Sequence, residues 1–206
     1  MTSIKPVRDT KKDHLLTPDN SLVIFIDYQP TQVNSINSSN KNLMMRNVVS
    51  LAKIAKLYSV PMVLSTVNVS TGRNADTVSP LKKELSDLPS IDRTSINAWE
   101  DREFLGAVET SGRKKLIIAA LWTEACLSFP TLDALQAGYD VYLPVDAVGG
   151  TSVLAHSTAL ARMEQAGARP VTLPQLLCEY QRDWDRVETV AGFVDLLTEV
   201  NAFPIH

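Results

Sequence analysis

Short apolar runs, each about as long as a buried strand, alternate along the chain with stretches of helical periodicity. The runs at 22–26 and 116–121 have no polar interruption, which is typical of strands covered on both faces in a parallel sheet. Further strands are predicted at 62–67, 91–94, 140–146 and 169–173. Helices are predicted at 41–58, 80–86, 100–111, 124–137 and 152–166. Strands that alternate with helices form βαβ units, so we expect a mostly parallel, doubly wound α/β sheet.

The chain divides into an arm and one domain. Residues 1–20 are polar and predict an arm that lies on the surface or on a neighbouring subunit. Residues 21–206 are expected to form a single domain, which includes an amphipathic helical tail at 187–200. The Ser/Asn-rich segment 29–40 is expected to be a loop.

Composition excludes several classes of function. A net charge of −3 gives no electrostatic footprint for nucleic acid or an anionic membrane. No apolar run approaches the roughly 20 residues of a membrane span. The three histidines are far apart in sequence, so we expect no metal. Glycine-rich phosphate-binding motifs are absent, so we expect no nucleotide cofactor. Two cysteines distant in sequence favour reduced thiols and a cytoplasmic location.

Two candidate catalytic side chains follow predicted strands. Asp27 ends the run 22–26, and Cys126 lies in the turn after the run 116–121. Ligands of open α/β sheets bind at the carboxyl ends of the strands, so both side chains should face one crevice. A helix N-terminus at Cys126 would lower the pKa of its thiol and favour the nucleophilic thiolate. The alternatives are a turn-forming or capping role for Asp27 and a packing role for Cys126. Cys178 is predicted to be a core residue.

Arg93, Asn97 and Trp99 lie in a segment of mixed periodicity, which indicates a loop over the crevice. A cation there would keep a carboxylate ionised and orient a substrate; the alternative is an ordinary surface charge. Asp146, which ends another predicted strand, favours a turn before the next glycines. His156 is expected at an exposed or interface position on its helix.

An ordered set of motifs resembles the isochorismatase-like cysteine hydrolase superfamily, most closely its YcaC-like branch. The resemblance covers roughly residues 18–185. Its motifs are VIFIDYQ around Asp27, RTSINAW from Arg93 to Trp99, LIIAALWTEAC ending at Cys126, DVYLPVDA ending at 147, and CEYQRDW starting at Cys178. The resemblance implies a three-layer α/β/α sandwich with a six-stranded parallel sheet, in agreement with the strand pattern.

The resemblance also implies a catalytic triad of aspartate, lysine and cysteine. Asp27 matches the base and Cys126 the nucleophile, whereas the lysine position is occupied by Arg93. Lys82 or Lys83 would take that position under another alignment. An arginine keeps the positive charge but stays protonated, so it cannot shuttle protons.

Other roles follow from the same resemblance. Trp122, Thr123 and Ala125 match the turn whose backbone N–H groups form the oxyanion hole, with a cis peptide expected at Trp122–Thr123. The substrate-binding positions are matched by Gln29, Asn97 and Trp99. The loop Asn68-Val-Ser-Thr-Gly72 lacks the Asp and His ligands of the metal-binding nicotinamidase branch, which again predicts no metal.

The predicted function is hydrolysis of a C–N bond in a small amide or carbamoyl compound through a thioester. The rival hypothesis is an oligomeric binding or stress protein that keeps the pocket without efficient turnover. A redox cysteine protein is weaker, because no C-x-x-C motif occurs. The resemblance also implies a homo-oligomer, with an octamer of two stacked rings as the expected assembly.

Overall fold

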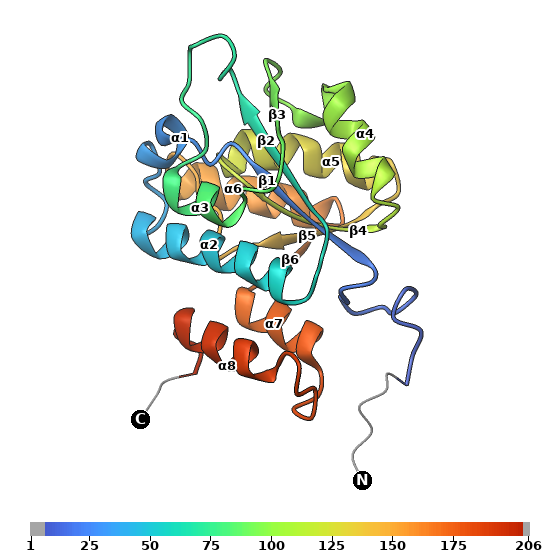
Figure 1. Cartoon of the computed structure of the whole chain (residues 1–206). Helices are drawn as coiled ribbons and strands as arrows, with labels where there is room; N and C mark the ends of the chain where they lie inside the picture. The colour runs from blue at the N-terminus through green and yellow to red at the C-terminus, as the bar shows by residue number, and fades with distance from the viewer. Residues whose placement is uncertain (1–6, 204–206) are drawn as a thin grey trace.

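A computed structural model gives the structure of the protein, and residues 7–203 are described here. All strands pair in parallel in one six-stranded sheet with the order β3-β2-β1-β4-β5-β6 (Figure 1). The strands are β1 (Ser21–Ile26), β2 (Met62–Val67), β3 (Ser90–Arg93), β4 (Lys115–Ala120), β5 (Asp140–Pro144) and β6 (Arg169–Val171). The predicted parallel sheet is therefore confirmed.

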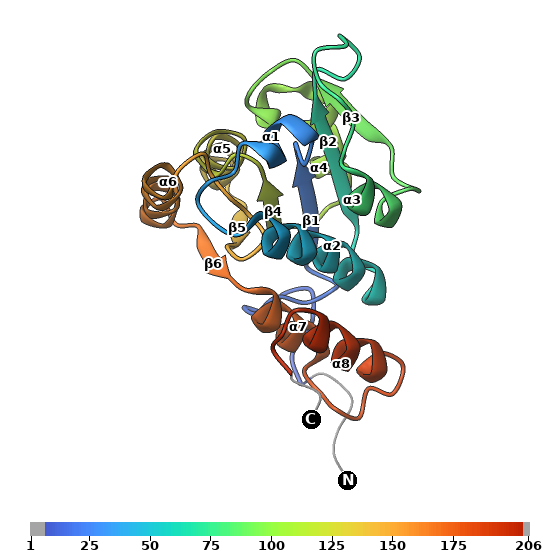
Figure 2. The ribbon, with the colours of Figure 1, turned by 90° about the vertical axis from the view of Figure 1, so that its left-hand side faces the viewer.

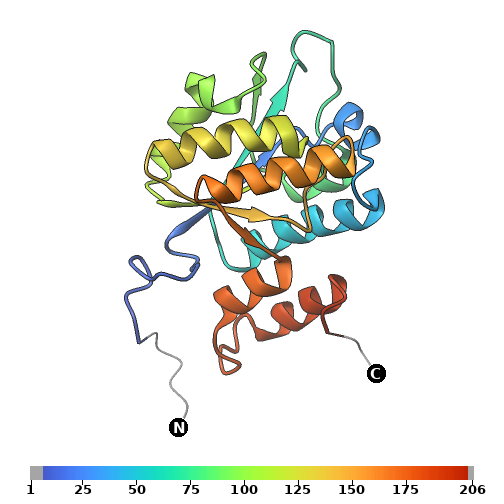
Figure 3. The same cartoon turned by 180° about the vertical axis from the view of Figure 1, so that it is seen from behind.

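Helices cover both faces of the sheet, as a three-layer α/β/α sandwich requires. In Figure 2 α2 and α3 lie on one face, and Figure 3 shows α5 and α6 side by side on the other. Helices α7 and α8 pack together beyond the sheet, beside α2. The α-helices are α1 (Pro30–Asn34), α2 (Lys41–Leu57), α3 (Ser79–Glu84), α4 (Arg102–Thr110), α5 (Ser128–Gln136), α6 (Val153–Gln165), α7 (Leu173–Gln181) and α8 (Val190–Glu199).

The strand order places a topological switch point between β1 and β4. From β1 the chain winds outward through β2 and β3, returns to pair β4 with the other edge of β1, and continues to β5 and β6. Both central strands are fully buried, as their uninterrupted apolar runs predicted. Connections leave a doubly wound sheet in opposite directions at such a point, and this opens a crevice at the carboxyl ends of the strands. Asp27 and Cys126 both follow strands that border it.

Two helices differ from the sequence expectations. Residues 30–34 form α1 inside the predicted loop, with Pro30 at the first helical position. Residues 173–181 form α7, although Leu173 was predicted to end a strand. Both helices are short, so their periodicity covers few residues and gives a weak signal beside strand-like neighbours. The predicted helix at 124–137 is also divided, because a π-helical turn (Thr123–Leu127) precedes α5.

The end of the predicted N-terminal arm, residues 13–20, packs against this chain's own core. Leu16 is completely buried, and the Lys115 ammonium donates hydrogen bonds to the backbone carbonyls of Asp13, His14 and Leu15. The guanidinium of Arg182 binds the buried Asp13 carboxylate. The Asp13 side chain and the backbone of residues 13–15 therefore bind specific partners rather than solvent. Residues 1–6 of the predicted arm lie outside the described residues.

Cys178 is exposed on α7, so the prediction that it is a core residue was wrong. Its neighbours Leu176 and Leu177 are among the buried residues of this helix. The helix turns Cys178 away from that apolar face, although all three residues are adjacent in a hydrophobic stretch. The helix itself was not predicted, so its buried face could not be assigned.

Candidate active site

Asp27 follows the last residue of β1 and is fully buried at the switch point. Its backbone has a φ of 60°, a left-handed conformation that aspartate adopts more readily than most residues. Its N–H donates to the Ser65 carbonyl of β2, and its own carbonyl accepts from Gln29 N–H. The alternative turn-forming role is therefore only part of its function, because the side chain turns inward to a charged partner.

That partner is Arg93, the last residue of β3. Nη1 lies 2.8 Å from Oδ1 of Asp27, and Nη2 lies 2.7 Å from Oδ2. Both side chains are completely inaccessible to solvent. A parallel, two-bond arrangement of this kind is the strongest geometry for an arginine–carboxylate pair. The guanidinium reaches across β2 to make it, so Arg93 is not a surface charge.

Neither alternative lysine lies in this position. Lys82 pairs with Asp76 at 3.3 Å, in a partly exposed ion pair, and Lys83 is exposed on α3. The cation beside Asp27 is therefore Arg93.

Cys126 lies in the π-helical turn after β4 and is 7% exposed. Burial raises the pKa of its thiol, and the Asp27 carboxylate raises it further by its charge and by accepting a hydrogen bond from the thiol. Arg93 and the Trp122 N–H act in the opposite direction. The expected lowering of the pKa was wrong, because loss of solvation and a close carboxylate outweigh the helix N-terminus. The raised pKa favours the neutral form of the Cys126 thiol beside a carboxylate that acts on it.

The cis peptide bond joins Leu121 to Trp122, one residue before the expected position. The strand pairing explains the shift, because Leu121 still forms a parallel bridge with Gly149 and the turn starts only after it. Among the three predicted oxyanion positions, the N–H groups of Thr123 and Ala125 bind the carbonyls of Gly149 and Trp122. A backbone hydrogen bond from Trp122 instead lowers the pKa of Cys126, because it stabilises the thiolate form.

Sequence reasoning missed the side chains that hold this turn. Oγ1 of Thr123 lies 2.8 Å from Nδ1 of His156 on α6, so His156 is half-buried and bonded rather than simply exposed. Burial lowers the pKa of His156. The Glu124 carboxylate accepts hydrogen bonds from the backbone and hydroxyl of Thr151. The indole N–H of Trp122 binds Oγ of Ser35 at 2.6 Å. No linear motif joins residues so distant in sequence.

The predicted substrate-binding side chains are engaged within the protein. The Gln29 amide binds the backbone of Val67 and the Ala75 carbonyl, which fixes the loop after β2. Asn97 caps the 3-10 turn at Trp99 and donates to Asp133 of α5. Trp99 packs edge-on against Phe104 and Tyr139. These contacts support positioning of loops, and substrate binding by the three residues remains a prediction.

Asp146 has a raised pKa, mainly because of burial. One of its carboxylate oxygens accepts a hydrogen bond from Leu173 N–H, so Asp146 caps the start of α7.

Within residues 7–203, no group of three or more His, Cys, Asp or Glu side chains is arranged to hold a metal ion. That activity needs no metal stays a prediction. In the same residues, no helix is long and apolar enough to cross a membrane.

Known proteins are similar to this chain in both sequence and fold. The isochorismatase domain model matches residues 21–175. The probable hydrolase YcaC of Escherichia coli is 35% identical over 85% of this chain and 84% of its own length. Its crystal structure, described as an octameric hydrolase of unknown specificity, superposes with a TM-score of 0.85 over 92% of each chain.

A second relative extends the comparison. The structure of YcaC from Pseudomonas aeruginosa with hexane-2,5-diol and covalent acrylamide has a TM-score of 0.84 and 34% identity. It covers 90% of this chain and 91% of its own. The matched domain spans every strand, and the chain belongs to the isochorismatase family of hydrolases.

Proposed function

We propose that the protein is a cysteine-dependent hydrolase that cleaves the C–N bond of a small amide or carbamoyl compound. The observation that carries the proposal is the placement of the buried Asp27 and Cys126 directly after the paired strands β1 and β4 at the switch point, where the Asp27 charge acts on the thiol. A thiol beside a positioned proton acceptor is the arrangement that nucleophilic catalysis by cysteine requires.

In the first half-reaction Asp27 accepts the thiol proton as the Cys126 sulfur attacks the substrate carbonyl carbon. The Trp122 N–H, whose backbone hydrogen bond acts on the Cys126 thiol in the resting enzyme, donates to the oxyanion. The C–N bond then breaks, and the leaving nitrogen takes the proton from Asp27. This leaves a thioester on Cys126 and releases the amine.

In the second half-reaction water attacks the thioester, with Asp27 again accepting a proton. The C–S bond breaks, the acid leaves, and the sulfur of Cys126 regains the proton. Proton transfer through Asp27 avoids a free thiolate in the resting enzyme, consistent with the raised pKa of Cys126. Arg93 holds both oxygens of Asp27 and stays protonated throughout.

The rival function, a binding protein with little turnover, is favoured by one specific feature. Each oxygen of Asp27 already accepts a hydrogen bond from Arg93, so both oxygens are engaged before a proton arrives from the thiol. Reaction of Cys126 with acrylamide at neutral pH would support the hydrolase, whereas an inert thiol would support the rival.

A screen of small amides, ureas and carbamoyl compounds tests the proposal. Ammonia or amine release should occur with the wild-type chain and disappear in Cys126→Ala and Asp27→Asn. Far-UV circular dichroism would confirm that both variants fold. Turnover that survives in Cys126→Ala would contradict the proposed nucleophile.

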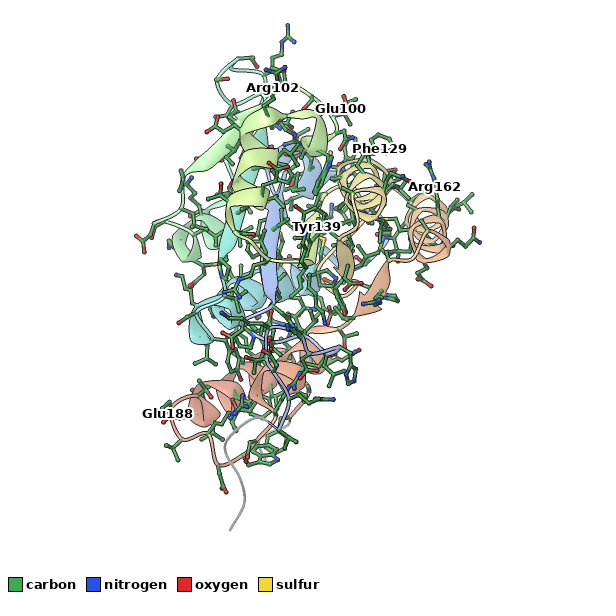
Figure 4. The ribbon with its side chains drawn as sticks, turned by 90° about the vertical axis from the view of Figure 1, so that its right-hand side faces the viewer. Glu100, Arg102, Phe129, Tyr139, Arg162 and Glu188 are labelled. Atoms are coloured by element: carbon green, nitrogen blue, oxygen red, sulfur yellow. The ribbon has the colours of Figure 1, made fainter. Side chains whose placement is uncertain are left out.

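We also propose that the chain forms a homo-oligomer, with the octamer of the E. coli relative as the expected size. Large apolar side chains are exposed on the outer helices, including Phe129 on α5 and Val153 and Leu154 on α6. Figure 4 shows Phe129 and Arg162 on these neighbouring helices. Light scattering should give the mass of an octamer, and a monomer at micromolar concentration would contradict it. A cytoplasmic location is proposed as well, and cell fractionation would test it.

A further inference from the structure

The guanidinium of Arg93 has almost no capacity left for a substrate. Nη1 lies within 3.0 Å of Asp27 Oδ1, the Ser65 hydroxyl oxygen and the Thr66 carbonyl oxygen. Nη2 contacts Asp27 Oδ2 at 2.7 Å and the Ile96 carbonyl oxygen at 3.2 Å. The N–H bonds of both terminal nitrogens are therefore occupied. Only Nε has no hydrogen-bond partner among the described residues.

This occupancy limits which substrate groups Arg93 can recognise. Arginine binds a carboxylate through a pair of parallel N–H bonds, which Asp27 already uses. The single remaining N–H, at the buried Nε, cannot form the two parallel bonds that a carboxylate would need. Arg93 is therefore not available as the carboxylate clamp that an arginine in an active site usually suggests.

The charges around Cys126 lead to the same conclusion. The positive charge of Arg93 is balanced by Asp27, and Asp101 adds a second negative charge close enough to act on Arg93. Asp27 and Arg93 are completely inaccessible to solvent. An anionic substrate would lose its hydration there without gaining an unpaired cation, and it would also approach a carboxylate.

We propose that this site selects uncharged carbonyl compounds and rejects anionic ones, an inference that rests on the proposed reaction at Cys126. The substrate class is thereby narrowed to small neutral amides and carbamoyl compounds that carry no carboxylate. Both small molecules in the P. aeruginosa YcaC structure, hexane-2,5-diol and covalent acrylamide, are uncharged.

Iodoacetamide and iodoacetate provide matched probes, because they have nearly the same size and differ in charge. Each forms a bond from sulfur to carbon and releases iodide, while the thiol proton is lost. The full-length native chain would be alkylated with each reagent at pH 7.5, and the rates at Cys126 and Cys178 would be measured by peptide mass spectrometry. Cys178 is exposed and reports the ordinary preference of a thiol within the same molecule.

The expected result is a ratio of iodoacetamide to iodoacetate rates at Cys126 that exceeds the ratio at Cys178 roughly tenfold or more. Equal ratios at the two cysteines would overturn the inference. Thiolate formation affects both reagents alike, so it cancels in each ratio. The wild-type measurement needs no turnover; a high ratio without amide hydrolysis would preserve the inference and refute the proposed function.

An Asp27→Asn variant adds a second test. The amide keeps the size of the side chain but leaves the Arg93 charge unbalanced. The ratio at Cys126 should then fall roughly tenfold or more from the wild-type value, while the ratio at Cys178 stays constant. An unchanged ratio at Cys126 in a folded variant would show that steric access, rather than charge, determines the selectivity.

Discussion

Replacing Arg93 by methionine tests the ion pair on which the site is built. Methionine retains much of the length and volume of the side chain but removes the charge and the hydrogen bonds. The Asp27 carboxylate would lose both of its contacts with the guanidinium, at 2.7 and 2.8 Å. It would then remain as an unpaired charge in a position with no solvent access.

The structure sets the expected size of the effect. Removal of one partner from a buried ion pair costs about 3–5 kcal/mol. No reduction for solvent screening applies, because neither side chain is accessible. The double variant Asp27→Asn/Arg93→Met removes the stranded charge and should recover a large part of that loss, since a buried pair contributes little net stability over neutral residues.

Urea unfolding followed by circular dichroism would measure these differences, at a fixed protein concentration because the chain is expected to associate. Lys56→Met is the matched control. It breaks the Lys56–Glu84 pair, whose side chains are 42% and 27% exposed, and should cost less than about 1 kcal/mol. A loss in Arg93→Met no larger than that of the control would refute the reasoning.

Three further predictions concern the turn, the thiol and the metal. A Cβ at Gly150 would lie 2.5 Å from Oε2 of Glu124, so Gly150→Ala should lower the free energy of unfolding in urea by about 1–3 kcal/mol and slow alkylation of Cys126. The control is Gly106→Ala, whose Cβ would meet no atom within 4 Å and which should change neither the stability nor the alkylation rate. Because the pKa of Cys126 is raised, its alkylation by iodoacetamide should climb about tenfold per pH unit from pH 7 to 9; a plateau below pH 8 would indicate a stabilised thiolate. Chelators should leave activity and melting temperature unchanged, and stoichiometric zinc in protein purified without an affinity tag would contradict this.

Strands that are buried on both faces were the easiest elements to predict. In β1 and β4 every residue is buried, so burial imposes an uninterrupted apolar run that can be read without knowing the partners. Helix α7 could not be recognised in this way. Its apolar residues pack against segments as distant as Ser21, which hydrogen-bonds Tyr180, and its exposed face carries Cys178.

In the candidate site too, some features could be predicted from the sequence and others could not. Asp27 and Cys126 were predictable because strand ends in a parallel sheet meet at one edge. The direction of the pKa shift at Cys126 could not be predicted, because it depends on how closely Asp27 approaches the thiol and on how much solvent reaches it. The contacts that hold the turn, such as Thr123 to His156, link residues whose proximity only the tertiary structure defines.

The covalent state of Cys126 during turnover is the most direct test of the proposed mechanism. Wild-type protein would be acid-quenched during hydrolysis of uncharged primary amides, and its cysteine peptides would be weighed by mass spectrometry. We predict an added acyl group on Cys126 that hydroxylamine removes, with no such group on Cys178. Amide hydrolysis that proceeds without an adduct and continues in Cys126→Ala would contradict the proposed mechanism.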